Sequence, residues 1–166
     1  FKKITTLMNN RGPDFCDTKV IEHNYFGHTR LSIIDLDVEA NQPMLFDDIL
    51  LVFNGEIYNY QELIISEELY CLTKSDSEVI IRLYQKYGID FLNKLNGMFS
   101  FCIYDIKKKR YFCARDRYAK KPFFYHFKEN KFIFASAIKP IIKLLGSTPK
   151  INKVALSQYF QYFVPI

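Results

Sequence analysis

The spacing of apolar residues changes along the first half of the chain, and each spacing predicts a different element. An unbroken apolar run at residues 49–53 is typical of a buried strand. Helical spacing predicts helices over residues 1–10 and 57–69. Two short strands are expected over residues 19–22 and 25–34, joined by a turn that contains an asparagine.

The start of a helix is marked most clearly at Ser75. Ser75 and Glu78 match a capping box, and apolar residues follow them at i, i+4 and i+8. A short helix over residues 90–95 is expected next. It should end at Asn96-Gly97, a pair that suits a C-terminal cap.

Beyond residue 97 the spacing becomes that of strands. Four strand-like runs separated by turns cover residues 98–104, 110–114, 122–127 and 131–136. A helix over residues 138–145 follows, and residues 155–162 begin another. This order predicts an α+β fold with antiparallel sheets and argues against a parallel Rossmann unit.

Composition narrows the class of protein. A chain of 166 residues fits one domain, and an apolar share of 49% can fill a core without disulfides. The cysteines show no paired spacing, which predicts reduced thiols in core positions: Cys16, Cys71, Cys102 and Cys113. The scattered histidines His23, His28 and His126 indicate structural roles, and no metal site is expected.

The net charge of +5 comes from 23 basic and 18 acidic side chains, and the basic residues are dispersed. The one dense run, residues 107–110, lies between two predicted strands, so a solvated hairpin tip explains it better than a nucleic-acid contact. The apolar runs are too short to span a bilayer, and no charged leader precedes an apolar core. We therefore expect a soluble, cytoplasmic protein that binds neither nucleic acid nor a membrane.

Asn54-Gly55 follows the predicted buried strand directly and has two interpretations. Asn-Gly is a strong hairpin signal, so the pair can be a turn. Alternatively, an Asn side chain and a Gly backbone N–H at one point supply two neutral donors. Such donors stabilise the oxyanion that develops when an amide or ester carbonyl is attacked.

Eight segments, taken in order, carry a resemblance that covers nearly the whole chain. They are Arg11-Gly12-Pro13-Asp14, Thr29-Arg30-Leu31-Ser32-Ile33-Ile34-Asp35-Leu36, Asn41-Gln42-Pro43-Met44, Asn54-Gly55-Glu56-Ile57-Tyr58-Asn59, Ser75-Asp76-Ser77-Glu78-Val79-Ile80, Leu95-Asn96-Gly97-Met98-Phe99, Ala114-Arg115-Asp116-Arg117-Tyr118 and Lys121-Pro122-Phe123-Phe124-Tyr125. Together they resemble the glutaminase domain of glutamine-hydrolysing asparagine synthetase, a class II glutamine amidotransferase of the N-terminal-nucleophile hydrolase type. The resemblance implies a four-layer αββα sandwich of two antiparallel sheets.

The same resemblance implies a pocket for free glutamine. Arg30 would pair with the α-carboxylate and Asp76 with the α-ammonium group. Their alternatives are a surface strand arginine and an acidic residue that stabilises the first turn of a helix. Asn54 and Gly55 would form the oxyanion hole.

Three further residues are implied at the amino-acid end of the substrate. Ile33 and Ile34 would line the pocket and lend backbone groups, or they are ordinary core residues of a strand. Glu56 would help to hold the substrate, or it is a turn residue. A cation and an anion at matched positions would select the zwitterion of free glutamine over simple amides.

The nucleophile of this family is a cysteine at the mature amino terminus, whose thiolate attacks the side-chain amide of glutamine. The chain starts with Phe1, and its Arg-Gly-Pro-Asp motif lies closer to the start than the family places it. We therefore expect the first strand and the nucleophile to be absent from the sequence. Cys16 follows that motif and has no terminal amine. The chain alone is expected not to turn over.

The resemblance also divides the chain and names its partners. Residues 1–150 would be the amidotransferase domain, and residues 151–166 the start of a linker and synthetase domain. A synthetase domain of this type uses ATP and magnesium to amidate aspartate, whereas no cofactor is expected in this chain. Expected partners are glutamine, that synthetase domain and a second copy in a homodimer. The alternative is a truncated glutamine-binding regulator or a structural pseudoenzyme.

Three positions depart from the family pattern. Asn10 stands where the family has His, and Ala137 stands where an acidic residue precedes Ile-Lys and could contact the synthetase half. Ala119 stands where Gly is usual before Lys-Lys-Pro. If Ala119 has a positive φ, it costs about 1 kcal/mol relative to Gly.

Overall fold

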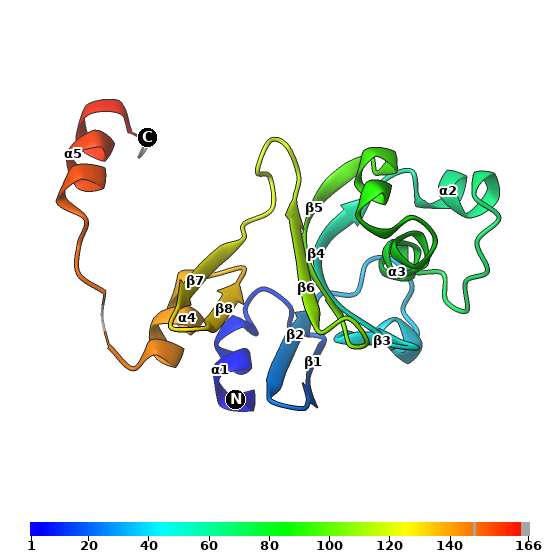
Figure 1. The fold of residues 1–166 in the computed structure, drawn as a ribbon, viewed down its shortest axis with the longest axis horizontal. Coiled ribbons are helices and arrows are strands. Elements are labelled where there is room, and N and C mark those ends of the chain that lie inside the picture. The colour runs from blue at the N-terminus through cyan, green and yellow to red at the C-terminus, as the bar shows by residue number, and fades with distance from the viewer. Residues whose placement is uncertain (148, 164–166) are drawn as a thin grey trace.

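The computed structural model describes residues 1–147 and 149–163, in an α+β arrangement of antiparallel sheets and helices (Figure 1). The helices are α1 Lys2–Thr5, α2 Tyr60–Ser66, α3 Asp76–Tyr87, α4 Ile138–Leu145 and α5 Lys153–Tyr162, with 3-10 turns η1 Thr6–Met8, η2 Val38–Ala40 and η3 Gly88–Lys94. The strands are β1 Phe15–Ile21, β2 Asn24–Arg30, β3 Met44–Phe46, β4 Ile49–Ile57, β5 Gly97–Asp105, β6 Arg110–Arg115, β7 Phe124–Lys128 and β8 Lys131–Ala135.

The central layer is a four-stranded sheet in the order β3-β4-β5-β6, and it separates two cores. Side chains alternate between the faces of a strand, so Phe101 and Ile103 point to one core, while Cys102 and Tyr104 point to the other. The larger core lies under α3, whose apolar stripe the sequence predicted. Its fully buried helix residues are Val79, Ile80, Ile81 and Leu83.

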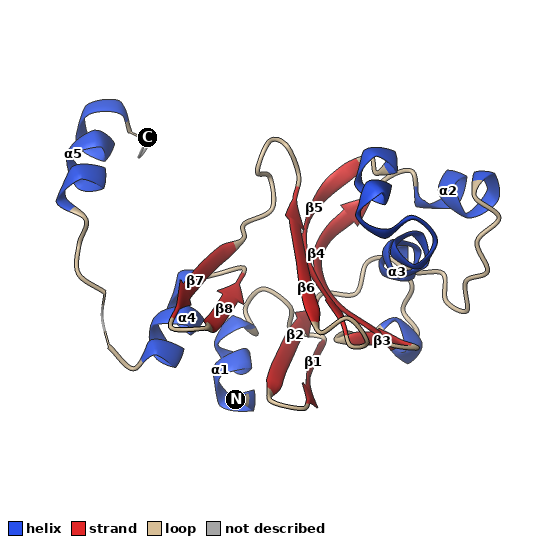
Figure 2. Cartoon of the chain, in the orientation of Figure 1, coloured by secondary structure: helices blue, strands red, loops and turns tan. Residues whose placement is uncertain are grey.

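A second layer, opposite α3, consists of two hairpins, β1-β2 and β7-β8, each a two-stranded antiparallel sheet (Figure 2). Phe26 of β2 and Phe134 of β8 pack with Leu50 and Val52 of β4 to form the smaller core. Helices α1 and α4 contact these hairpins and each other on the outside. The four layers are therefore helix, sheet, paired hairpins and helix, which confirms the predicted αββα sandwich.

Two predicted elements end earlier or start later than the apolar pattern indicated. The strand expected over residues 25–34 ends at Arg30, because the β1 ladder begins at its partner Phe15. The helix expected over residues 57–69 starts at Tyr60. Ile57 belongs instead to β4, where it pairs with Gly97 and is fully buried.

The predicted caps are confirmed in one case and wrong in two details. Ser75 caps α3 by accepting a hydrogen bond from the Ser77 N–H at 3.2 Å. Glu78 does not complete a capping box, because its carboxylate turns to the preceding loop and accepts from the N–H of Thr73 at 2.7 Å. Gly97 is no cap for η3: it starts β5, and a Cβ there would collide with the Glu56 carbonyl oxygen.

The basic run 107–110 lies at the β5–β6 hairpin tip, as predicted. Lys107 and Lys108 form ion pairs there with Asp48 at 2.5 Å and Asp105 at 3.1 Å. Helix α5 buries none of its residues and lies apart from the layers (Figure 1). Within residues 1–147 and 149–163, we find no helix with the length and apolar character needed to cross a membrane.

Candidate functional site

Asn54 and Gly55 lie within β4, where they pair with Ser100 and Phe99 of β5. The hairpin-turn interpretation of this Asn-Gly pair is therefore wrong. Position 55 requires a glycine, because a Cβ there would collide with the Met98 carbonyl oxygen of the neighbouring strand. The pair is thus held rigidly by the central ladder.

Beyond Leu51, the last residue paired with β3, one edge of β4 has no neighbouring strand within the described residues. Side chains take over its hydrogen bonds. The Phe53 N–H donates to Gln42 Oε1 at 2.6 Å, and the Phe53 carbonyl accepts from His28 Nε2 at 3.1 Å. Further along, the Ile57 N–H donates to Asp76 Oδ2 at 2.9 Å.

The Gly55 N–H lies on this edge, between the two satisfied residues. Backbone groups of a strand point alternately to its two neighbours, so Gly55 shares the direction of Phe53 and Ile57 and faces away from β5. No group in the described part of the chain accepts a hydrogen bond from the Gly55 N–H. The N–H of Gly55 is available to a ligand.

The Asn54 side chain provides a second free donor next to the first. Its Nδ2 is buried and has no hydrogen-bond partner among the described residues. A buried donor left unpaired costs about 1–3 kcal/mol, so its presence in a rigid strand indicates a ligand group. The two neutral donors predicted to form an oxyanion hole are therefore adjacent in the chain and unpaired within the described residues.

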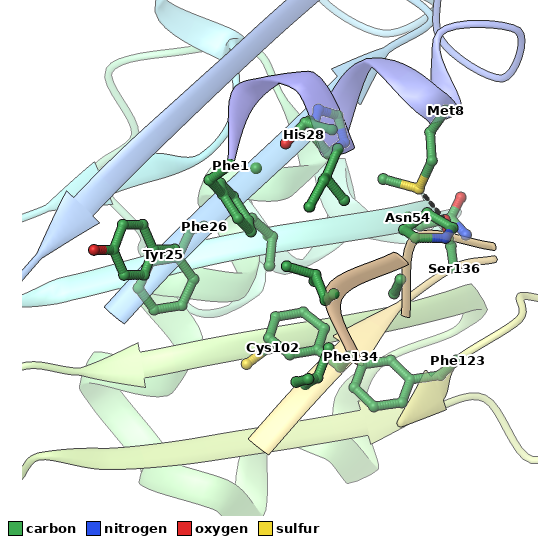
Figure 3. A pocket seen from close by; sticks show the side chains of 18 of the residues that line it. Phe1, Met8, Tyr25, Phe26, His28, Asn54, Cys102, Phe123, Phe134 and Ser136 are labelled. Carbon is green, nitrogen blue, oxygen red and sulfur yellow. Dashed lines mark hydrogen bonds between the residues drawn. The ribbon is translucent and has the colours of Figure 1, made fainter. Parts of the chain in front are cut away.

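The Asn54 side chain lines a cavity of about 380 Å³ between the central sheet and the two hairpins. Figure 3 shows Phe26, Phe123 and Phe134 around this cavity and Asn54 at one end. Residues 24–29 and 131–136 border it in unbroken runs, so the backbones of β2 and β8 contribute to its wall. Each of these strands has one ladder partner in the described chain, which leaves one edge free.

His28 holds the β4 edge and also lines the cavity, a role that the sequence did not reveal. Burial, reinforced by the positive charge of Arg30, lowers its pKa to about 4, so the ring is neutral near pH 7. Because Nε2 donates to Phe53, Nδ1 carries the lone pair, and it has no partner among the described residues. The alternation of Phe26, His28 and Arg30 along β2 could have predicted that the His28 side chain points to the buried face of this strand.

Arg30 is buried, and its guanidinium organises the loop that follows β2. One terminal nitrogen donates to the Asp37 carbonyl at 3.1 Å and to Asn41 Oδ1 at 2.7 Å. The other donates to the carbonyls of Ile34, at 3.3 Å, and Asp35. The interpretation as a surface strand arginine is wrong, and both nitrogens predicted to bind a carboxylate contact loop oxygens.

Asp76 joins the start of α3 to the end of β4 through its bond to the Ile57 N–H. Burial raises its pKa to about 6, and the nearby Glu56 carboxylate adds to this rise, although backbone N–H groups oppose it. The negative charge of an ionised Asp76 is therefore only partly balanced by its hydrogen-bond donors in this structure. A cation placed beside it would restore the balance.

A series of hydrogen bonds links the surroundings of Arg30 to strand β4 and to the start of α3. Asn41 touches Arg30, and the next residue, Gln42, bonds both Phe53 and Ser77 Oγ, the latter at 3.2 Å. In the sequence, Gln42 had no predicted role beyond its place in the segment Asn41-Gln42-Pro43-Met44. The isoleucines are less involved: Ile33 is 73% exposed, and Ile34 contributes its carbonyl to Arg30.

The other family positions have structural explanations. Asp116 accepts hydrogen bonds from the N–H groups of Phe99, Tyr118, Lys120 and Lys121, and so shapes the loop that follows β6. Ala119 within this loop has a φ of 54°, which confirms the expected strain. Ala137 is the N-cap of α4 and makes no side-chain capping bond.

A family model described as a glutamine amidotransferase domain matches residues 1–165. The chain belongs to this family. A putative glutamine-hydrolyzing asparagine synthetase 2 of Methanocaldococcus jannaschii is 39% identical, over 98% of this chain and 36% of that protein. The glutamine-hydrolyzing asparagine synthetase 3 of Bacillus subtilis is 34% identical, over 95% of the chain and 27% of that protein. The resemblance inferred from the motifs is confirmed.

This amidotransferase domain spans about a third or less of the length of the relatives it matches. Among solved structures, the glutamine phosphoribosylpyrophosphate amidotransferase of B. subtilis, complexed with ADP and GMP, gives a TM-score of 0.61 at 22% identity. The matched region covers 74% of this chain and 29% of the B. subtilis chain. At this identity the likeness establishes the fold alone.

Proposed function

We propose that this amidotransferase domain binds free glutamine and, in the full-length protein, supplies the oxyanion hole for hydrolysis of glutamine to glutamate and ammonia. The unpaired donors Asn54 Nδ2 and Gly55 N–H carry the proposal. An oxyanion in this position accepts from both. The rigid β4–β5 ladder means that the donors need little reorganisation when the charge develops.

We assign substrate recognition to one cation and one anion. The α-carboxylate of glutamine would replace the Ile34 and Asp35 carbonyl oxygens on Arg30, which requires the loop 31–37 to shift. The α-ammonium group would bind Asp76, whose carboxylate lacks a compensating cation. Glu56 would assist beside it, and Ile33 and Ile34 move with the loop.

The attacking group would be a thiolate that forms a thioester with the substrate carbonyl and releases ammonia. Cys102 lines the same cavity as Asn54, but burial raises its pKa well above the usual thiol value, so it is a poor nucleophile. We place the reactive thiol on a further strand that pairs with the free edges of β2 and β8 and fills the cavity.

We further propose that the ammonia serves a synthetase domain of the same protein, as the names of the two relatives suggest. That domain would use ATP and magnesium to activate aspartate. Residues 151–166 would begin the connection to it, in keeping with a helix α5 that buries no residue of its own.

The proposal is tested in the full-length protein by Asn54→Ala. Loss of one oxyanion donor should lower glutamine-dependent product formation about 10²–10³-fold. Ammonia-dependent product formation should be unchanged, because it bypasses this site. Asn93→Ala is a matched control, because Asn93 is exposed in η3 and should leave both activities intact. Equal loss of both activities in Asn54→Ala would contradict the assignment.

A further inference from the structure

Two cysteines whose spacing in the sequence suggests no pairing lie directly opposite each other in the central sheet. The β5–β6 ladder pairs Cys102 with Cys113. Residues paired in an antiparallel ladder project their side chains to the same face. Both thiols therefore lie on the hairpin side of the sheet, in the smaller core.

The two thiols also influence each other's ionisation. The neighbouring Cys102 lowers the pKa of Cys113, while burial raises the pKa of Cys102. Cys102 has no exposed surface, whereas Cys113 is only partly buried. The pair thus has an accessible, thiolate-prone member and an inner one.

The backbone geometry permits a bond between them. Opposed residues of an antiparallel ladder have Cα atoms about 4.5–5.5 Å apart. This lies within the range of about 4.4–6.8 Å that disulfides span. The ladder register therefore places the two residues within the span of a disulfide.

We propose that Cys102 and Cys113 form a reversible cross-strand disulfide in the wall of the cavity, with a low-molecular-weight disulfide such as glutathione disulfide as the oxidant. The Cys113 thiolate attacks one sulfur of glutathione disulfide, breaks its S–S bond and releases one glutathione thiolate, which takes up a proton. Cys102 is a weak nucleophile toward a substrate, but the ladder holds it opposite Cys113; its sulfur attacks Cys113 in the mixed disulfide as its proton passes to the second glutathione, which leaves as a thiol. The protein loses two electrons and two protons, and the oxidant becomes two thiols.

This site is independent of the proposed hydrolysis. Cys102 pairs with Val52, two residues before Asn54 on β4, and both cysteine and asparagine line the cavity (Figure 3). Oxidation would therefore change the cavity wall beside Asn54 without using either oxyanion donor. The chain becomes redox-sensitive at a position where the sequence pattern indicated inert core thiols.

The test treats the reduced protein with glutathione disulfide, traps free thiols with N-ethylmaleimide and maps tryptic peptides by mass spectrometry. The basic run 107–110 separates the two cysteines, so trypsin releases them on different peptides. We expect one linked pair of peptides, with Cys102 and Cys113 both unlabelled and no glutathione retained. Cys102→Ser should stop at a stable glutathione adduct on Cys113, and Cys71→Ser, the matched control, should still form the link.

Labelling of Cys113 in the treated wild-type protein would overturn the proposal. A glutathione adduct that persists on wild-type Cys113, as in Cys102→Ser, would overturn it as well. The wild-type peptide map decides the question even if a serine variant does not fold. Addition of dithiothreitol should restore labelling at both positions.

Discussion

The two faces of the central sheet differ in how completely their polar groups are paired. On the α3 face, the buried polar residues Ser75, Ser77 and Glu78 all have hydrogen-bond partners within a large apolar core. On the hairpin face, Asn54 and His28 each keep a buried polar atom without a partner in the described chain. One face accounts for stability, and the other retains unpaired groups beside a cavity.

Two carboxylates in the first turn of α3 show the same contrast. Burial alone would raise the pKa of Glu78, but hydrogen bonds from Leu72, Thr73 and Arg82 outweigh it and lower the pKa. Asp76 is as buried but has fewer donors, and its pKa rises to about 6. A carboxylate with many donors stabilises the fold, whereas one with few donors and a raised pKa can gain from a cationic ligand.

The largest expected effect is at Glu78. Glu78→Gln removes the charge that Arg82 pairs with at 2.8 Å, and it replaces one acceptor oxygen by a donor facing backbone N–H groups. We expect the free energy of unfolding, measured with urea, to fall by about 3 kcal/mol. Glu62→Gln, at an exposed position of α2, should change it by less than about 0.5 kcal/mol. Equal effects of the two variants would refute the stabilising role of the Glu78 hydrogen bonds.

An effect of similar size and opposite sign is expected for Asp76→Asn. The pKa of Asp76 rises from 3.8 to about 6 on folding, so its ionisation destabilises the folded state. At about 1.4 kcal/mol per pH unit, removal of the charge should stabilise the protein by about 3 kcal/mol at pH 7.5. The same variant should lose glutamine binding in calorimetry.

The pH dependence fixes the sign of that prediction. Protonation of Asp76 stabilises the wild-type fold fully below about pH 4, and this contribution is lost as the pH rises through 6. The advantage of Asp76→Asn should therefore be greatest above pH 6 and disappear near pH 4. A constant difference across this range, or a less stable variant at pH 7.5, would refute the account of Asp76.

The smallest expected effect concerns the N-terminal caps of α3 and α4. Helix α3 has a capping side chain in Ser75, whereas α4, on the hairpin side, begins at Ala137 without one. Ala137 has the extended backbone of an N-cap, with φ −145° and ψ 152°. Ala137→Asp should raise the free energy of unfolding by about 1 kcal/mol. Ala137→Val should give no such gain in the same urea titration.

The sequence by itself determined the local elements and the family. Apolar spacing located α3, α4 and most strands, because the periods of 3.6 and 2 record which side of an element is buried. The motif order identified the amidotransferase domain. Element ends were less well determined: Ile57 and Gly97 were assigned to helical regions, but pairing between β4 and β5 extended both strands through them.

Only the tertiary structure decided which polar groups are paired. The free N–H of Gly55 depends on where β3 stops, the partners of Arg30 depend on the path of the loop 31–41, and the pairing of Cys102 with Cys113 depends on strand register. These are relations between segments far apart in the chain. Local spacing cannot encode them, because register and loop path are set by the packing of the whole domain.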